Sequence, residues 1–206
     1  AVSILNFHYA YPPDTVGENY GLQRAIGDNE TGFKGTGDDH YRKEGWAFLL
    51  AGGALYNNLD YSFTVGHEDG SFRYPPTQPG GGGPELRRQL AVLAAFIRSF
   101  DFIRMAPRED LVQADLPAGI RMEVLAEESR QYAVYVYREA AAAQEATCTL
   151  RLSLPAGSYE AGWLDPASGE WANVQRSADT LAHGGGALEL ISPPFAQDLS
   201  LRLIRR

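Results

Sequence analysis

The sequence predicts an α/β unit followed by an all-β unit. Up to about residue 108, short apolar runs alternate with stretches of helical spacing. From about residue 110, apolar residues recur at every second position, as they do in strands with one buried face. Turn-forming glycines and prolines separate these later runs. We therefore assign residues 1–109 to the α/β unit and residues 110–206 to an antiparallel β-sandwich.

Three short apolar runs predict the strands of the first unit. They cover residues 2–7, 25–27 and 54–56. Each run is followed by polar or aromatic side chains, and these are His8 and Tyr9, then Asp28, Asn29 and Glu30, then Asn57, Asn58, Asp60 and Tyr61. The carboxyl ends of parallel strands carry the active sites of α/β barrels. An alternative is that these residues are polar only because strand ends meet water.

Two helices are predicted between and after these strands. Asp38 and Asp39 provide a cap and an acidic first turn for a helix that continues to Leu50. Pro84 suits the first position of a second helix, which apolar spacing extends to about residue 105. The glycines at 80–83 lack the Lys-Ser/Thr ending of a phosphate loop, so we interpret them as a flexible linker or lid.

Six period-two runs predict the strands of the second unit. They cover residues 120–124, 132–137, 147–154, 159–163, 187–191 and 199–204. Alternation within them places Leu150, Leu152, Leu201 and Leu203 in the core, and Cys148 is expected to be a buried structural thiol. For Trp163 and Trp171, packing in the core and a hairpin is favoured over a sugar-stacking platform.

The amino-acid composition limits the classes of partner that the protein is expected to bind. The net charge is −8 and the pI is near 5.0, which disfavours nucleic acids and anionic membranes because both select a basic face. No apolar stretch approaches the ~18 residues of a membrane-spanning helix. Four scattered histidines without paired spacing and a single cysteine indicate neither a metal site nor a disulfide, and no cofactor is expected.

The order of motifs resembles clan A glycoside hydrolases, which are (β/α)8 barrels. The resemblance rests on a strand ending in His8 and Tyr9, a strand ending in Glu30, and a helix of the pattern Tyr-Arg-x-x-x-Trp-x-x-Leu-x-x-Gly from Tyr41. An aromatic-Asn strand at 56–57 follows. These correspond to barrel strands six, seven and eight. The implied fold is therefore a partial barrel, its last three strands and closing helix, followed by the sandwich.

This resemblance implies a glycosidase. The glutamate of strand seven is the nucleophile in this clan, so Glu30 becomes the nucleophile of a retaining mechanism, with Tyr9 or His8 positioning it. The remaining polar residues at the strand ends would contact sugar hydroxyls, and they are His8, Tyr9, Asp28, Asn29, Asn57, Asn58, Asp60 and Tyr61. The substrate would be a carbohydrate, and an extracellular or periplasmic location is favoured.

The acid/base residue of the mechanism has no clear counterpart. In the clan it is a glutamate at the end of strand four, upstream of residue 2. A retaining mechanism needs a second carboxyl ~5–5.5 Å from the nucleophile, and Asp28 or Asp60 could replace it. The simpler expectation is that another polypeptide, either an N-terminal barrel half or a second copy of the chain, supplies the acid, and that the isolated chain has no turnover. The alternative function is a non-catalytic carbohydrate-binding or scaffold protein derived from such a barrel.

Overall fold

The computed structural model describes residues 2–9, 14–140, 144–174 and 180–206. The chain forms two compact units, Ala1–Phe96 and Ile97–Arg206, and the boundary along the chain falls within helix α3 (Pro84–Arg98). The sequence placed the change between residues 109 and 110, at the point where the strand pattern begins.

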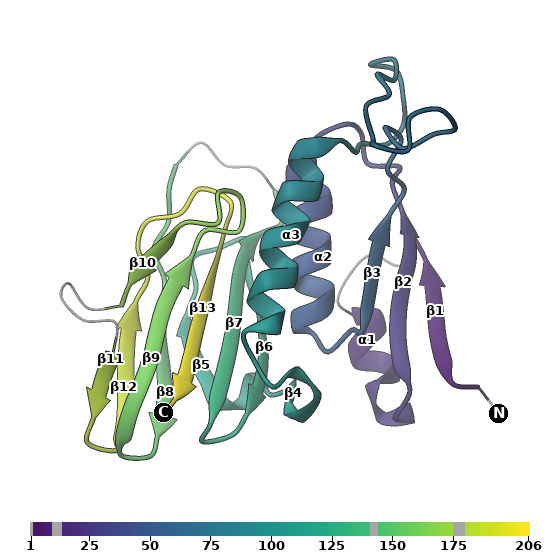
Figure 1. Cartoon of the computed structure of the whole chain (residues 1–206). Coiled ribbons are helices and arrows are strands. Elements are labelled where there is room, and N and C mark those ends of the chain that lie inside the picture. The colour runs from purple at the N-terminus through teal and green to yellow at the C-terminus, as the bar shows by residue number, and fades with distance from the viewer. Residues whose placement is uncertain (1, 10–13, 141–143, 175–179) are drawn as a thin grey trace. The chain divides into compact units, whose positions relative to one another are not determined.

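The first unit contains a three-stranded parallel sheet with the order β1-β2-β3. The strands are β1 (Ile4–His8), β2 (Ala25–Thr31) and β3 (Leu55–Asn58). Helix α1 (Asp14–Asn19) and a 3-10 turn (Tyr20–Leu22) lie between β1 and β2 in the chain, and α2 (Asp38–Leu50) lies between β2 and β3. All three strands point toward the same edge of the sheet (Figure 1). Parallel strands linked by helices fit part of a barrel.

Helix α2 packs between the sheet and α3. A Cβ atom added at Gly45 would lie 2.8 Å from the Tyr56 ring of β3 and 3.4 Å from Leu93 of α3, so only glycine lets the three elements approach this closely. The rings of Trp46 and Phe96 are 4.9 Å apart between the two helices. On the sheet side, buried Ile26 of β2 packs with Val16, Phe48 and Ala51.

Helix α3 ends earlier than its apolar spacing predicts. The expected end near residue 105 is wrong, because the regular helix stops at Arg98. There the Phe100 amide donates a hydrogen bond to the Ile97 carbonyl in a tightened turn. The Asp101 amide donates a hydrogen bond to Oε1 of the Gln131 side chain. A 3-10 turn (Phe102–Arg104) follows. No helix in the described part of the chain is long and apolar enough to cross a membrane.

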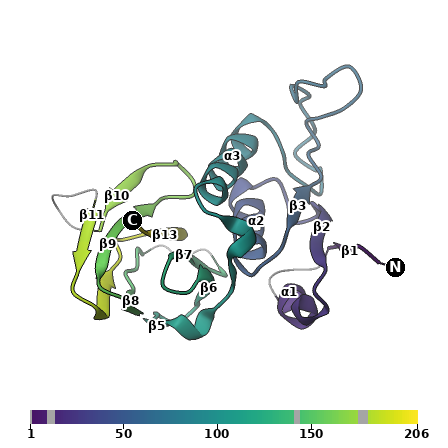
Figure 2. The ribbon, with the colours of Figure 1, turned by 60° about the horizontal axis from the view of Figure 1, so that its bottom comes forward.

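The second unit, most of whose strands are labelled in Figure 2, consists of antiparallel strands in two sheets. The larger sheet has the order β10-β9-β13-β7-β6-β4, with β11 also paired to β9, and the smaller has the order β12-β8-β5. All six predicted strands are present. The bounds are β4 (Ala106–Pro107), β5 (Val112–Asp115), β6 (Ile120–Glu127), β7 (Gln131–Arg138), β8 (Thr149–Leu154), β9 (Gly157–Leu164), β10 (Trp171–Asn173), β11 (Thr180–His183), β12 (Gly186–Ile191) and β13 (Asp198–Arg205). A further 3-10 turn (Glu109–Leu111) precedes β5.

Both sheets contribute to one hydrophobic core. Leu150 and Leu152 of β8 lie in the same buried cluster as Leu201 and Leu203 of β13, as the alternating pattern predicts. The Cys148 thiol is free and buried at the edge of β8. The two tryptophans differ: Trp163 is in the core, whereas Trp171 is half-exposed and has the Arg202 guanidinium 4.9 Å from its ring centre.

Candidate functional site

The carboxyl ends of β1 and β2 bring His8, Tyr9 and Glu30 together. The Tyr9 hydroxyl donates a hydrogen bond to Oε1 of Glu30. Nδ1 of His8 lies 3.2 Å from Oε2 of the same carboxylate. The Glu30 side chain is about one-third exposed, at 32%. Both carboxylate oxygens are therefore held from the neighbouring strand while the group stays accessible from solvent.

An irregularity in the strand pairing sets this geometry. Phe7 pairs with Asp28 but His8 pairs with Glu30, so Asn29 is an extra residue on β2. Bulges of this kind often lie next to active sites, where they redirect a side chain. Tyr9 has φ of 55°, a left-handed backbone uncommon for an aromatic residue, and its amide bonds to the Glu30 carbonyl at 2.8 Å. The turn at Tyr9 returns its side chain to Glu30.

The interaction with Glu30 changes the acidity of Tyr9. The hydrogen bond to Glu30, followed by partial burial and the negative charge of Glu30, raises the pKa of Tyr9 to about 12. A phenol with this pKa keeps its proton at neutral pH. Tyr9 is therefore a fixed hydrogen-bond donor to Glu30 across the physiological pH range.

Asp28 lies on the buried side of the same strand. It is fully enclosed, and neither carboxyl oxygen has a hydrogen-bond partner among the described residues. Burial raises the pKa of Asp28 to about 6. In a regular strand, Asp28 and Glu30 at i and i+2 would share a face, but the bulge at Asn29 leaves one enclosed and the other accessible.

A second enclosed carboxyl, Glu44, comes from α2. Its Oε2 accepts hydrogen bonds from the Thr31 hydroxyl at 2.6 Å and the Tyr56 hydroxyl at 3.1 Å. Burial raises the pKa of Glu44 to about 7, and the nearby Asp28 charge acts in the same direction. Sequence reasoning did not select Glu44, because its helix position gave no sign that it would point at the sheet.

The three asparagines of the strand ends are in different environments. The Asn57 side chain is exposed at the site edge of β3, and its Nδ2 donates to the Asn29 carbonyl at 3.1 Å. Asn29 Oδ1 and Asn58 Nδ2 are buried polar atoms without a hydrogen-bond partner among the described residues. Buried polar atoms of this kind normally bind a water or a ligand.

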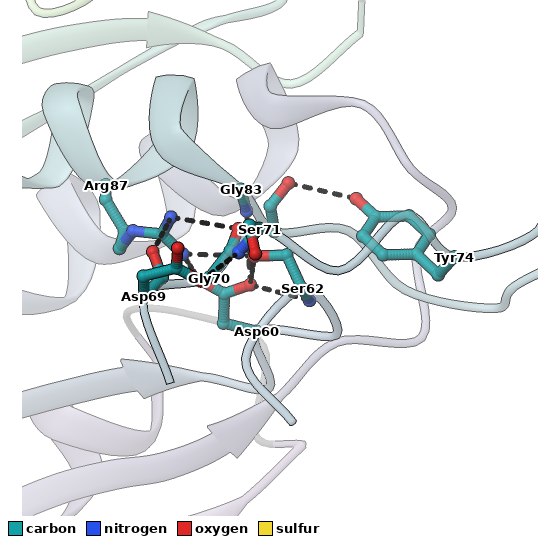
Figure 3. Close-up of polar contacts among 9 residues, drawn as sticks. Asp60, Ser62, Asp69, Gly70, Ser71, Tyr74, Gly83 and Arg87 are labelled. Atoms are coloured by element: carbon teal, nitrogen blue, oxygen red, sulfur yellow. Dashed lines mark hydrogen bonds and ion pairs between the residues drawn. The ribbon is translucent and has the colours of Figure 1, made fainter. Parts of the chain in front are cut away.

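Asp60 holds the loop that follows β3. Its Oδ1 accepts hydrogen bonds from the amide and hydroxyl of Ser62 and from the Gly83 amide, and its Oδ2 pairs with Arg87 (Figure 3). These donors lower the pKa of Asp60 despite its partial burial. Arg87 also reaches the carbonyls of Asp69 and Gly70. The carboxylate therefore joins both ends of the 62–83 loop to the start of α3.

Gly80, Gly81 and Gly82 are closely packed, in contrast to the flexible linker or lid that the sequence suggests. A Cβ atom at Gly80 would lie 1.9 Å from the Gly32 carbonyl oxygen and 2.2 Å from the Tyr61 ring. One at Gly81 would lie 2.9 Å from the Tyr41 ring. Gly80 and Gly81 therefore occupy positions where a side chain would clash, and Gly80 lies directly beside the loop that follows Glu30.

Aromatic rings border the accessible side of the site. Phe33 lies 5.2 Å from Tyr9 and 6.5 Å from Tyr61, between ring centres. Tyr9 and Phe33 are both about half exposed. Phe33 was not selected from the sequence, although a large apolar residue in a polar, glycine-rich loop was a usable signal. Among the described residues, no three or more His, Cys, Asp or Glu side chains are grouped to hold a metal ion.

Comparison with known proteins supports this description at the level of fold. No family model and no curated protein sequence matches the chain. Solved structures do match. One described as a glycoside hydrolase has a TM-score of 0.59 and 12% identity, over 88% of this chain and 42% of its own. A glycoside hydrolase family 5 protein from Bacteroides vulgatus has a TM-score of 0.60 and 10% identity, over 96% of this chain and 47% of its own.

A third similar structure is a GH30 endoxylanase from Clostridium papyrosolvens, with a TM-score of 0.52 and 11% identity, over 100% of this chain and 49% of its own. The chain has the fold of part of a glycoside hydrolase. It spans slightly less than half the length of these glycoside hydrolases. At 10–12% identity the likeness concerns the glycoside hydrolase fold alone.

Proposed function

We propose that this chain carries the nucleophile of a retaining glycosidase, and that Glu30 is that nucleophile. The observation that supports the proposal best is the pair of contacts to the Glu30 carboxylate. Tyr9 and His8 bind its two oxygens at the carboxyl ends of adjacent parallel strands. Active sites of barrel enzymes lie at this edge. The glycoside hydrolase fold of the whole chain is consistent with it.

In the proposed reaction, an oxygen of Glu30 attacks the anomeric carbon of the sugar. The glycosidic C–O bond breaks, and the leaving oxygen takes a proton from a general acid. The resulting ester between Glu30 and the sugar is then hydrolysed by water, which gives its proton back to that group. Tyr9 and His8 fix the direction of the attacking oxygen, since a misdirected carboxylate loses much of its rate advantage.

The general acid is proposed to come from polypeptide outside the described unit. Asp28 is enclosed, and the carboxylate of Asp60 is occupied by Ser62, Gly83 and Arg87. The sheet also leaves apolar side chains uncovered, with Ile4 46% and Leu55 44% exposed. Parallel strands are normally buried on both faces. Further barrel polypeptide or a second copy of the chain would cover these residues and bring the acid to Glu30.

Sugar hydroxyls are proposed to bind at the accessible edge beside Glu30. Asn57 and the partly exposed Tyr61 present polar atoms there, whereas Asn29 Oδ1 is buried. In contrast, we propose structural roles for Asp28, Asn58 and Asp60, because their side chains are enclosed or already engaged.

The test is the substitution Glu30→Gln in the natural, full-length protein, assayed on a panel of natural glycosides. Loss of the negative charge with the shape preserved should lower kcat by about a thousandfold or more. Glu18→Gln, an exposed change on α1, is the matched control and should leave kcat unchanged. Turnover of Glu30→Gln near that of the unchanged protein would exclude Glu30 as the nucleophile.

A second candidate is carbohydrate binding without catalysis. It is favoured by one observation: the other strand-end carboxylates of the described unit, Asp28 and Asp60, are enclosed or engaged. In this case the full-length protein would bind glycans at the Glu30 site and cleave none of them. Bound but uncleaved oligosaccharide at saturating protein concentration would distinguish it from the enzyme.

A further inference from the structure

Helix α2 contributes one enclosed carboxyl, that of Glu44, which the proposed reaction does not use. Glu44 is 3% exposed, and its Oε2 lies 2.6 Å from the Thr31 hydroxyl and 3.1 Å from the Tyr56 hydroxyl. Thr31 is enclosed as well, and it directly follows Glu30 in β2. Enclosing a carboxyl costs free energy that an apolar side chain would not cost. A carboxyl kept here despite that cost points to a function at the strand end that carries Glu30.

The backbone around Glu30 is paired less regularly than the rest of β2. On the side of β3, regular pairing stops where Asp28 lies opposite Tyr56, and it resumes where Thr31 lies opposite Asn58. Glu30 lies in the gap between these pairs, so Thr31 is the first residue after it that is paired to β3. The carboxyl on α2 holds Thr31 through its hydroxyl group. A shift of Thr31 would therefore change the direction of the Glu30 side chain.

The surroundings of Glu44 favour its protonated form. Tyr56 has a single hydroxyl proton, which faces both the Tyr41 carbonyl at 3.0 Å and the Glu44 carboxyl at 3.1 Å. The two hydroxyl contacts and the exposed Lys34 favour the charged form, but less than burial opposes it. Burial, with the charge of the enclosed Asp28 acting in the same direction, raises the pKa of Glu44 to about 7.

We propose that Glu44 is a positioning residue for Glu30, which holds Thr31 in place while it is protonated and releases it when it loses its proton. The proposal rests on the function proposed above and adds an alkaline limit to the reaction at Glu30. An ionised Glu44 would place a negative charge in an enclosed space next to Asp28, so α2 and the end of β2 would move apart to admit water. The titratable groups that interact with these two carboxyls are His8, Lys34, Tyr41 and Tyr56.

The test is the pH dependence of dinitrophenolate release by the 206-residue chain. The reagents are dinitrophenyl glycosides of gluco, xylo and manno configuration with fluorine on the carbon beside the anomeric centre. Their leaving group needs no proton, so a general acid imposes no alkaline limit on the release. Glu44→Gln cannot ionise, and its amide can still bond to both hydroxyls, whereas Glu44→Ala removes both bonds. Glu18→Gln, an exposed change on α1, is the matched control.

The rate constant of the unchanged chain should fall between pH 6 and pH 9. The fall should be at least about tenfold, because two pH units above a pKa of about 7 only about one molecule in a hundred keeps the proton. Glu44→Gln should keep the rate constant found at pH 6 and should not show the fall. Glu44→Ala should be slow at both pH values, and Glu18→Gln should behave like the unchanged chain.

Three outcomes would overturn the positioning role and leave Glu30 as the nucleophile. One is a rate constant that does not fall in the unchanged chain, and another is a fall that persists in Glu44→Gln. The third is loss of the fold of the unchanged chain by pH 9 in circular dichroism, since the fall would then report unfolding. Glu44→Gln decides the question even where Glu44→Ala does not fold. Release from none of the glycosides at any pH would refute both the proposed function and the positioning role.

Discussion

The hydroxyl of Tyr9 and the carboxylate of Glu30 are joined by a hydrogen bond between two adjacent parallel strands. Tyr9 reaches Glu30 from a left-handed backbone conformation at the end of β1, and its own amide bonds to the Glu30 carbonyl. Side chain and backbone thus hold the same partner residue. Uncommon backbone conformations often persist at functional sites, where the surrounding contacts enforce them.

This contact predicts an abnormal titration of Tyr9. Because the hydrogen bond to Glu30 raises the pKa of Tyr9 to about 12, the phenol should remain mostly protonated at pH 11. In Glu30→Gln the negative charge is gone, and Tyr9 should titrate nearer the ordinary value of about 10. Ring-labelled tyrosine NMR, with the signal assigned through Tyr9→Phe, measures both. An unchanged Tyr9 pKa in Glu30→Gln would mean that the two groups do not interact.

The packing of the glycine run predicts a severe effect of Gly80→Ala. The new methyl group would lie 1.9 Å from a backbone oxygen of Gly32, so the strand end that carries Glu30 would have to move. We expect the first unit to lose about 2–4 kcal/mol of stability. Gly17→Ala, in α1 with nothing within 4 Å of the added atom, should be neutral or slightly stabilising. Equal unfolding midpoints for the two variants would argue against this packing.

The two enclosed carboxyls predict that the first unit is more stable at acidic pH. Burial raises the pKa of Glu44 to about 7 and that of Asp28 to about 6. A carboxyl group whose pKa is raised in the folded state stabilises the fold fully at pH values below its unfolded pKa, which is about 4. This stabilisation is lost as the pH rises through the pKa of the folded state. For Glu44 the loss is on the order of 3 kcal/mol between pH 4 and 8.

Hydrogen exchange of the α2 and β2 amides across this pH range measures the effect. Glu44→Gln should remove a large part of the pH dependence, while the exposed change Glu18→Gln should leave it intact. A pH dependence that Glu44→Gln leaves unchanged would contradict the raised pKa of Glu44.

In the second unit, truncation of a buried and of an exposed aliphatic side chain to alanine should cost clearly different amounts of stability. Leu152 of β8 is almost fully buried, and Leu152→Ala should cost about 2–5 kcal/mol through the cavity it leaves. Ile191, at the end of the neighbouring β12, is 65% exposed, and Ile191→Ala should cost less than about 1 kcal/mol. Urea denaturation of the full chain, followed by tryptophan fluorescence, to which Trp163 in this core contributes, measures both. Similar costs would show that the buried face of β8 is assigned wrongly.

Local signals in the sequence predicted much of this fold. The acidic first turn at Asp38 and Asp39 located the start of α2 where it lies, but the expected aspartate cap is wrong, because the cap residue is Gly37 and no side chain caps the helix. Alternation located the strands of the second unit that have five or more residues. The strands that were missed, β4, β5, β10 and β11, have two to four residues, too few for a period of two to be recognised.

The candidate site was only partly predictable, because its geometry depends on contacts between distant segments. Strand ends indicated His8, Tyr9 and Glu30. The extra residue Asn29, which separates Asp28 from Glu30, exists only in the pairing of β2 with β1. The close packing of Gly80 likewise depends on Gly32, far earlier in the chain.

Covalent trapping tests the role of Glu30 most directly. Dinitrophenyl fluoroglycosides, with fluorine on the carbon beside the anomeric centre, react without an acid catalyst because the leaving group needs no proton, and fluorine slows hydrolysis of the ester formed. The 206-residue chain should release dinitrophenolate from at least one glycoside of a gluco-, xylo- and manno-configured panel. Peptide mass spectrometry should then locate the sugar on Glu30, and Glu30→Gln should abolish labelling. A sugar ester on any other carboxylate, or no labelling with the whole panel, would contradict the assignment of Glu30 as the nucleophile.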